Sequence, residues 1–509
     1  METSRTKNSS YNIIMGFMNK AIATLLTFIS RYVFLKFLSL EYLGINGLFS
    51  DVLSMLTLAD LGFATAMAYS FYKPLAQKDE RKLSALIQFY KKLYNYIALI
   101  VGGIGIAILP FLRMIVNTEK DIPYLEWYYL VALANTVISY LFIYKSTIIT
   151  ADQKSYLVTK YSMWVNFART IIQIIVLCLT HNYFCYVLVS VFTTLINNLI
   201  VSMAADKYYP YINAKNELTK EEKKSIFVNM KSVFLYKVSS VLLTGTDNIL
   251  ISILVGTAAV GLYANYNTIV SNITAFSSII VSSLTASIGN LVIKENEERR
   301  YEVFKVMQMV SFTIGGVVIG CLWFLMQDFI VLWIGEKCLL DQEAVFAILV
   351  NFYLALILPP IWVFREATGL YQKTKYIMLI TAGINIALSI VFGLKFGVAG
   401  IIAATFISKI STYFWYEPKL LFHEFFHKKV HQYYLSNLIN LFILIFGIFL
   451  LTIILPKGSA STWLEWIIRA FICGGVMSIL YLIRFVKTSE FKSLKERILR
   501  IMKGVKKET

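Results

Sequence analysis

The chain has 509 residues, of which 58% are hydrophobic and only 15% are charged, and its mean hydropathy is +0.65. A soluble domain carries more charge and fewer apolar residues, so most of this protein is expected to face lipid. The net charge of +18 would suit nucleic acid, but in a membrane protein the placement of the positive residues decides their meaning.

Hydropathy predicts an all-α integral membrane protein with about 14 transmembrane helices, each near the ~20 residues that a bilayer requires. The first stretch lacks a small-residue cleavage site, so we expect a retained helix rather than a signal peptide. In chain order the predicted spans are residues 11–37, 43–72, 93–112, 126–149, 156–180, 183–204, 228–255, 260–293, 303–334, 344–364, 376–394, 398–421, 434–455 and 463–485.

Positive charge is distributed unevenly between the segments that join these spans. With the N-terminus inside, most of the 48 Lys and Arg fall on inner segments, which satisfies the positive-inside rule throughout. Both termini are then cytoplasmic, and the basic segments meet the anionic lipids of the inner leaflet, so no nucleic acid partner is needed. The outer segments carry only Lys36, Arg113, Lys120, Lys337, Lys395 and Lys457.

Short outer loops and scattered cysteines exclude several classes of protein. Residues 39–41, 181–182 and 256–259 are little more than turns, whereas an extracellular polymerase or glycosyltransferase normally needs a larger outer domain. The five cysteines form no CxxC pair, so neither a zinc ribbon nor a disulfide framework is expected.

An internal repeat relates the two halves of the chain at a shift of 217 residues. YNIIMGFMNKA (11–21) aligns with VNMKSVFLYKV (228–238), which places Lys20 on Lys237, and LGI (43–45) aligns with VGL (260–262). Each copy holds six spans, an even number, so both copies have the same orientation in the membrane. The sequence therefore predicts two parallel six-helix lobes around a central cleft, plus two extra C-terminal helices, as in alternating-access transporters.

This repeat gives the expected domains. The N-lobe takes residues 1–204, a polar cytoplasmic linker that is long enough to flex takes 205–227, and the C-lobe takes 228–422. The two extra helices take 423–486. Residues 487–509 are expected to form a basic amphipathic cytoplasmic tail, with Phe491, Leu494, Ile498 and Met502 along one stripe.

Residues 31–86 contain three distinctive segments, EYLGINGLF (41–49), ADLGFATA (59–66) and YKPLA (72–76), and the second copy contains GTAAVGLYANYN (256–267). On these segments the chain resembles bacterial polysaccharide flippases of the multidrug, oligosaccharidyl-lipid and polysaccharide exporter superfamily. The resemblance covers roughly residues 12–421.

The resemblance implies a flippase that moves undecaprenyl-pyrophosphate-linked oligosaccharide from the inner to the outer leaflet of the bacterial inner (plasma) membrane. The repeat units of O-antigen, capsule or exopolysaccharide are its usual cargo, and the polysaccharide polymerase machinery is an implied partner. The sequence has no Walker-type phosphate-binding loop. We expect that the protein is not an enzyme and that it binds no cofactor and no metal ion.

An anionic head group that crosses hydrocarbon needs cations in a polar cleft, and a charge inside a span costs at least a few kcal/mol. Lys20 and Lys237 are repeat-related, so we expect them to face each other and receive the pyrophosphate; snorkelling of both side chains to the inner interface is the alternative. Arg169 and Lys409 are further candidates for pyrophosphate or sugar binding. Arg469 is expected to snorkel.

Arg31 lies on the same predicted helix face as Lys20 and could also contact the cargo. At the 217-residue shift Arg31 corresponds to Asn248, the neighbour of Asp247, so Arg31 and Asp247 are expected at similar heights in opposite lobes. One hypothesis is that they form a gate, and the alternative is that each has a separate partner within its own lobe. Asp60 could pair with Arg169, and both Asp60 and Asp247 could couple transport to an ion. Amides and hydroxyls at Asn19, Asn46, Asn265, Asn267 and Tyr263 could bind sugar or another helix.

Two local motifs remain. HEFFHKKVH (423–431) has the His-Glu-x-x-His spacing of a zinc protease, but two lysines lie within it and no further ligand is found, so we expect the cytoplasmic end of a helix. Pro359 and Pro360 are expected to kink or break their span.

The alternatives to the polysaccharide flippase are a lipid II flippase and a cation-coupled multidrug exporter of the same superfamily; a membrane polymerase or glycosyltransferase is less favoured.

Overall fold

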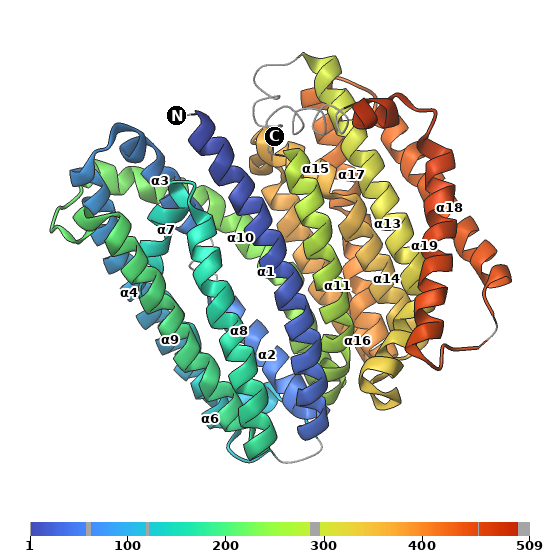
Figure 1. The fold of residues 1–509 in the computed structure, drawn as a ribbon, viewed down its shortest axis with the longest axis horizontal. Helices are drawn as coiled ribbons and strands as arrows, with labels where there is room; N and C mark the ends of the chain where they lie inside the picture. The colour runs from blue at the N-terminus through green and yellow to red at the C-terminus, as the bar shows by residue number, and fades with distance from the viewer. Residues whose placement is uncertain (1, 58–62, 119–121, 286–295, 457, 497–509) are drawn as a thin grey trace. The chain divides into compact units, whose positions relative to one another are not determined.

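A computed structural model describes residues 2–57, 63–118, 122–285, 296–456 and 458–496. It is all-helical in these ranges (Figure 1). Seven helices are long and apolar enough to cross a membrane, and two bent helix pairs raise the number to nine among the described residues. The chain is thus a multi-pass membrane protein, whereas the expected count of about 14 spans is not reached by this measure.

The chain divides into two compact units, residues 1–264 and 265–509. The helices of the first unit are α1 (Glu2–Phe37), α2 (Leu40–Leu56), α3 (Phe63–Gln77), α4 (Glu80–Ile108), η2 (Leu109–Phe111), α5 (Leu112–Ile115), α6 (Leu125–Tyr140), α7 (Ile143–Ala151), α8 (Ser155–Thr180), α9 (Tyr183–Tyr208), η3 (Pro210–Asn213), α10 (Lys220–Leu254) and the start of α11 (Thr257–Thr285).

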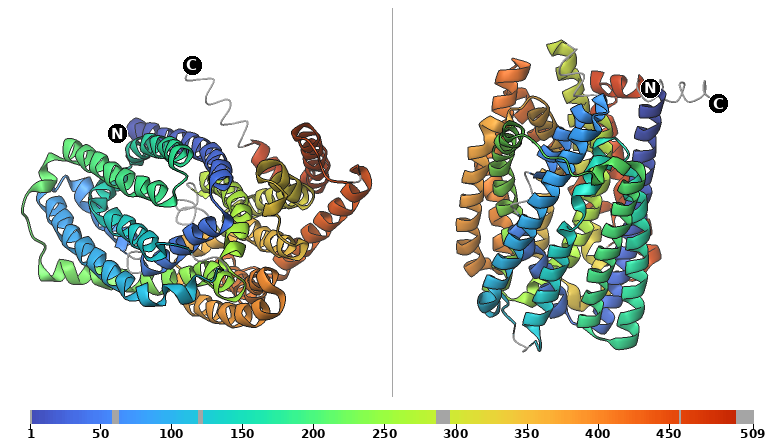
Figure 2. Two further views of the ribbon diagram at one scale, coloured as in Figure 1. Left: turned by 90° about the horizontal axis from the view of Figure 1, so that it is seen from below. Right: turned by 90° about the vertical axis from the view of Figure 1, so that its left-hand side faces the viewer.

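The second unit takes the rest of α11 and the helices that follow it. These are α13 (Glu297–Ile334), η4 (Glu336–Cys338), α14 (Gln342–Ile357), α15 (Pro359–Ala367), α16 (Tyr371–Ser411), α17 (Tyr413–Leu421), the π-helical turn η5 (Phe422–Phe426), α18 (His431–Ile454) and α19 (Trp463–Phe485). Within each unit the long helices run side by side (Figure 2).

The helix boundaries repeat as the sequence predicts. The ends of α1 and α10, the starts of α2 and α11, the starts of α4 and α13, and both ends of α6 and α14 are each 217 residues apart. Even the N-caps of α4 and α13 correspond, since Asp79 accepts from the Lys82 amide and Asn296 accepts from the Arg299 amide. Equivalent positions therefore carry equivalent helix-initiation signals in the two copies.

Helix α10 belongs to the first unit, although the repeat assigns residues 228–264 to the second lobe. It packs against α2 and α3, and near its end Ser252 Oγ donates to the Ile115 carbonyl at 2.7 Å. The Asn117 amide group donates to the Ile253 carbonyl at 3.3 Å, and the Thr257 amide donates back to Asn117. These hydrogen bonds join the end of α10 to the last residue of α5 and to the loop between α5 and α6.

The segment that was expected to flex, residues 205–227, is packed onto the first unit. Ile212 and Leu218 are buried in a core with residues of α4, and Asn216 Nδ2 donates to Ser84 Oγ at 2.6 Å. Helix α10 then starts with a capping box at Thr219 and Glu222. The linker is thus an ordered part of the unit.

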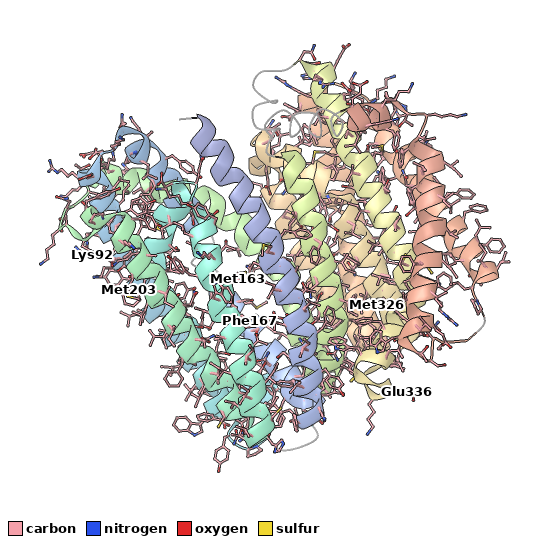
Figure 3. The ribbon with its side chains drawn as sticks, viewed as in Figure 1. Lys92, Met163, Phe167, Met203, Met326 and Glu336 are labelled. Atoms are coloured by element: carbon pink, nitrogen blue, oxygen red, sulfur yellow. The ribbon has the colours of Figure 1, made fainter. Side chains whose placement is uncertain are left out.

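Large apolar side chains cover the outside of the helices as well as the interior. Met326 on α13 is buried, whereas Met203 on α9 is 62% exposed and projects outward (Figure 3). On α19, Leu464, Phe471 and Ile483 are at least two-thirds exposed. Contiguous exposed apolar surface of this extent needs lipid to cover it.

Two predicted spans are broken at the same point of the repeat. Helices α6 and α7 meet at a bend of 45°, and α14 and α15 meet at 41°. The second break has Pro359 at the first turn of α15, as expected. The first has no proline; instead, Asn198 Nδ2 donates to the carbonyls of Ile138, Ser139 and Leu141 at the break.

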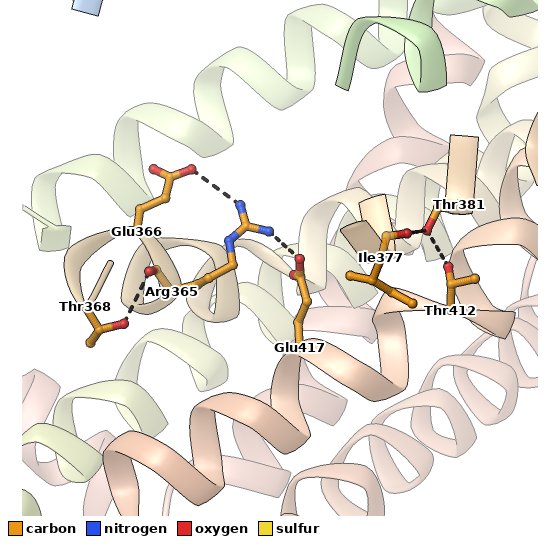
Figure 4. A network of polar contacts seen from close by, with 7 residues as sticks. All are labelled: Arg365, Glu366, Thr368, Ile377, Thr381, Thr412 and Glu417. Carbon is orange, nitrogen blue, oxygen red and sulfur yellow. Dashed lines mark hydrogen bonds and ion pairs between the residues drawn. The ribbon is translucent and has the colours of Figure 1, made fainter. Parts of the chain in front are cut away.

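A charged pair holds the helix that follows each break. In the first unit Lys145 on α7, which is buried, contacts Asp206 on α9 at 2.7 Å. In the second unit Arg365 on α15 binds Glu417 on α17, and both side chains are at most 3% exposed (Figure 4). Arg365 also contacts Glu366 at 3.5 Å. Each pair therefore joins the second half of a broken span to another helix of the same unit, α9 in the first unit and α17 in the second.

Repeat-related glycines allow a close helix crossing within the first unit. A Cβ on Gly44 of α2 would lie 1.9 Å from the Thr257 carbonyl oxygen, and a Cβ on Gly261 of α11 would lie 2.3 Å from that of Leu40. Backbone cannot yield as a flexible side chain does, so any side chain here must push the helices apart.

We expect Gly44→Ala to lower the melting temperature of the purified protein by several degrees, with Gly261→Ala behaving alike. Gly103→Ala on α4 is the matched control, because nothing lies within 4 Å of its Cβ position. That substitution should leave stability unchanged or raise it slightly, since alanine favours a helix by roughly 0.5–1 kcal/mol over glycine. Equal melting temperatures for Gly44→Ala and Gly103→Ala would contradict the close crossing.

Candidate functional site

Polar residues recur every three or four positions on several apolar helices of the first unit. Helix α8 has Arg169, Thr170 and Gln173, α1 has Thr27, Ser30 and Arg31, α2 has Asn46 and Ser50, and α9 has Tyr186 and Ser190. This spacing puts the polar residues of each helix on one face. Because α1 packs on α8 and α8 on α9, the polar faces converge.

The convergence forms a polar cavity of about 170 Å³, which we call the arginine cavity. Both Arg31 and Arg169 line it, although they are 138 positions apart in the sequence. The Tyr186 hydroxyl is hydrogen bonded to Ser30 and lies close enough to both guanidinium groups to interact with them electrostatically. The remaining lining residues are Leu26, Thr27, Phe34, Leu43, Asn46, Thr170 and Gln173.

The arginine cavity has binding capacity that the protein itself does not use. Arg169 Nε is buried and has no hydrogen-bond partner in the described structure. A buried donor without a partner costs about 1–3 kcal/mol, and an intramembrane charge costs more, so such a group is usually kept for a ligand. Two guanidinium groups that line one cavity suit an anion with several oxygens, above all a phosphate.

A second cavity of about 350 Å³ shares Asn46 with the first, and we call it the hydroxyl cavity. It lies between α2, α6 and α9. Gln173 connects the two, because it lines the arginine cavity and donates to Ser190 Oγ, which lines the hydroxyl cavity, at 2.9 Å. The residues that line the hydroxyl cavity are Asn46, Phe49, Ser50, Leu53, Ser54, Thr57, Ala132, Asn135, Thr136, Tyr183, Val187 and Ser190.

Neither a protein-family model nor a curated protein sequence matches the chain. Solved structures do match. The lipid II flippase MurJ in an inward closed conformation is 13% identical, with a TM-score of 0.67 over 93% of this chain and 100% of that chain. An inward-facing MATE family transporter of the MOP superfamily is 16% identical, with a TM-score of 0.58 over 79% of this chain and 97% of the other.

A further MATE multidrug transporter, DinF-BH, is 14% identical and has a TM-score of 0.59 over 83% of this chain and 97% of its own. The chain has the fold of these transporters. The predicted fold class, an all-α integral membrane protein, is thereby confirmed at the level of architecture, whereas the count of about 14 helices is not.

The predicted site residues lie at different places within this fold. Arg31 and Arg169 line one cavity. Lys20 is partly exposed on α1, about 16 Å along the helix axis from Arg31 at 1.5 Å per residue. Lys237 lies on α10, but its side chain and the whole of Asp60 are outside the described residues. The pairing of Lys20 with Lys237 therefore stays a prediction.

The other two predicted residues have different surroundings. Asp247 lies on α10 beside Asn248, whose amide group donates to Asp51 Oδ2 on α2 at 2.5 Å. A gate between Arg31 and Asp247 stays a prediction, but the structure places α1 and α10 in one unit rather than in opposite ones. Lys409 belongs to the second unit, where it donates to Asn351 Oδ1 at 3.4 Å.

Arg469 was expected to snorkel, but its side chain is only 13% exposed and lies 3.7 Å from Asp328. That carboxylate also accepts from the Ala460 amide at 2.8 Å. Arg469 is thus held by an ion pair inside the second unit.

The histidine motif does not form a regular α-helix. Phe422–Phe426 is a π-helical turn, and His427 has a left-handed φ of 48°. Glu424 forms an ion pair with Lys373, and His427 lies 3.6 Å from Glu297. Within the described residues, no group of three His, Cys, Asp or Glu is arranged to hold a metal ion.

Sequence reasoning missed Gln173, Tyr186, Asn135 and Ser190. Each belongs to a polar stripe at three- or four-residue spacing on an otherwise apolar helix, and this stripe was the available signal. A search for charge alone finds Arg31 and Arg169 but overlooks the uncharged residues beside them.

Proposed function

We propose that this protein is a flippase that carries an undecaprenyl-pyrophosphate-linked oligosaccharide repeat unit from the inner to the outer leaflet of a bacterial inner membrane. Transport takes place by alternating access of the two lobes, with both chain termini in the cytoplasm. The observation that carries this proposal is the convergence of Arg31 and Arg169 on one small cavity among apolar helices. Such a pair is costly in a membrane unless an anion uses it.

The likeness to MurJ and to MATE transporters supports a transporter fold but not a cargo. The charge of the cavity discriminates between the possible cargoes. Two arginines repel a cationic drug and attract a pyrophosphate, so the multidrug alternative is disfavoured. Lipid II flipping is the second candidate, since the MurJ structure covers 93% of the chain and a lipid-linked pyrophosphate has the same anionic group.

Deletion in the source bacterium tests the proposal. Mass spectrometry of the lipid fraction should find an accumulated polyprenyl-pyrophosphate oligosaccharide, accessible only from the inner face, and wild-type protein should restore its export. Accumulation of lipid II instead would select the second candidate. Normal levels of every lipid-linked sugar after deletion would refute both.

A further inference from the structure

The hydroxyl cavity is adjacent to the proposed phosphate site but has a different chemistry. Among the described residues that line it, none is charged. Its volume of about 350 Å³ lies at the lower end of the ~300–1,000 Å³ typical of small-molecule sites. The arginine cavity, at about 170 Å³, is below that range and suits a compact group such as a phosphate.

Several oxygen atoms that line the hydroxyl cavity can accept hydrogen bonds from a ligand. Ser50, Ser54 and Thr136 each donate their hydroxyl proton to a backbone carbonyl of their own helix, at 2.8, 2.8 and 3.1 Å. Their oxygen lone pairs therefore remain as acceptors. Asn135 Oδ1 is buried and has no hydrogen-bond partner in the described structure. A ligand that donates several hydrogen bonds would satisfy these atoms.

We infer that the hydroxyl cavity binds the neutral sugar that is linked directly to the phosphate group, while the arginine cavity holds that phosphate. This inference rests on the proposed function and adds the substrate subsite to it. A neutral sugar presents a ring of hydroxyl donors, and the shared residue Asn46 places the two cavities next to each other, as the two groups are in the cargo. A sugar carboxylate would bring a negative charge into a cavity whose described lining residues include no cation to pair with it.

The test measures binding to full-length protein in nanodiscs by calorimetry, with three probes. These are farnesyl pyrophosphate and its glucose-linked and glucuronic-acid-linked forms. We expect wild-type protein to bind the glucose-linked probe about tenfold more tightly than farnesyl pyrophosphate, and to gain nothing from glucuronic acid, because sites built on hydrogen bonds discriminate strongly.

The combined change Asn135→Leu and Thr136→Val should reduce the tenfold gain to less than about twofold and leave the affinity for farnesyl pyrophosphate unchanged, because only sugar contacts are lost. Ser54→Ala is the milder variant, in case the first does not fold, and should reduce the gain partly. The matched control is Thr452→Val on α18, whose exposed hydroxyl also bonds its own helix, at 2.9 Å. It should change nothing.

The outcomes separate the two proposals. A wild-type protein that binds farnesyl pyrophosphate and its glucose-linked form equally, or variants that keep the full gain, would overturn the sugar subsite while the phosphate site stands. Equal affinity for the glucose and glucuronic acid forms would overturn the requirement for a neutral sugar. If no probe binds the wild-type protein, the proposed function fails together with the subsite.

Discussion

Arg169→Met is expected to abolish export of the lipid-linked head group and, at the same time, to raise the melting temperature of the protein. Arg169 Nε is buried without a hydrogen-bond partner, so this donor is a cost to the fold that a bound anion would offset. A methionine of similar length removes that cost. Charged hydrogen bonds to phosphate contribute roughly 1.5–3 kcal/mol, so binding of pyrophosphate should weaken by about 10- to 100-fold.

Opposite changes in stability and activity are the signature that distinguishes a binding residue from a structural one. Arg169→Lys keeps the charge but not the planar fork, and should retain intermediate activity. Lys160→Met on the same helix is the matched control, since Lys160 is exposed; it should leave export unchanged. Melting curves of purified protein and complementation of the deletion strain provide the measurements. A large loss of stability in Arg169→Met would assign Arg169 a structural role instead.

Removal of one partner from the Arg365–Glu417 pair is expected to destabilise the second unit by about 3–5 kcal/mol, because it leaves Glu417 buried without its cation, or leaves Arg365 with the longer contact to the exposed Glu366 in place of its buried carboxylate. Both side chains are at most 3% exposed, so water cannot replace the missing partner. The pair also joins α15, which follows the break at Pro359, to α17. Either Arg365→Met or Glu417→Leu should therefore yield poorly folded protein with a strongly reduced melting temperature.

The double change Arg365→Met with Glu417→Leu should recover most of the lost stability, since replacing a whole buried ion pair by apolar residues is often neutral or stabilising. The Lys373–Glu424 pair is the exposed control, with side chains 57% and 31% exposed. Lys373→Met should cost no more than about 1 kcal/mol, as at most surface pairs. A double variant no more stable than the worse single one would contradict the charge-burial explanation.

Much of the fold could be predicted because its signals are local. Long apolar stretches located α8, α9, α18 and α19 to within a few residues of their observed ends. The break at Pro359 was predicted from proline chemistry, whereas the break after Tyr140 was not. At that break the carbonyls of Ile138, Ser139 and Leu141 accept hydrogen bonds from Asn198. This residue is 57 positions beyond Leu141, so no local pattern marks the break.

The candidate site was predicted only in part, for a related reason. Arg31 and Arg169 were found individually, since a charge inside an apolar span is conspicuous in the sequence. Their meeting in one cavity depends on which faces of α1 and α8 pack together. The side chain of Arg469 was expected to reach the membrane interface. Its ion pair with Asp328 could not be recognised, because the two residues are 141 positions apart in the sequence.

The sequence by itself determined the membrane character of the chain, most of its helices and the 217-residue repeat, because apolar stretches and aligned residues can be recognised along the chain without knowledge of how the helices pack. Only the tertiary structure decided which polar faces converge, that α10 joins the first unit, and that charged and uncharged polar residues form two adjoining cavities. These outcomes depend on side-chain packing and hydrogen bonds between helices far apart in the sequence, and no local pattern encodes such contacts.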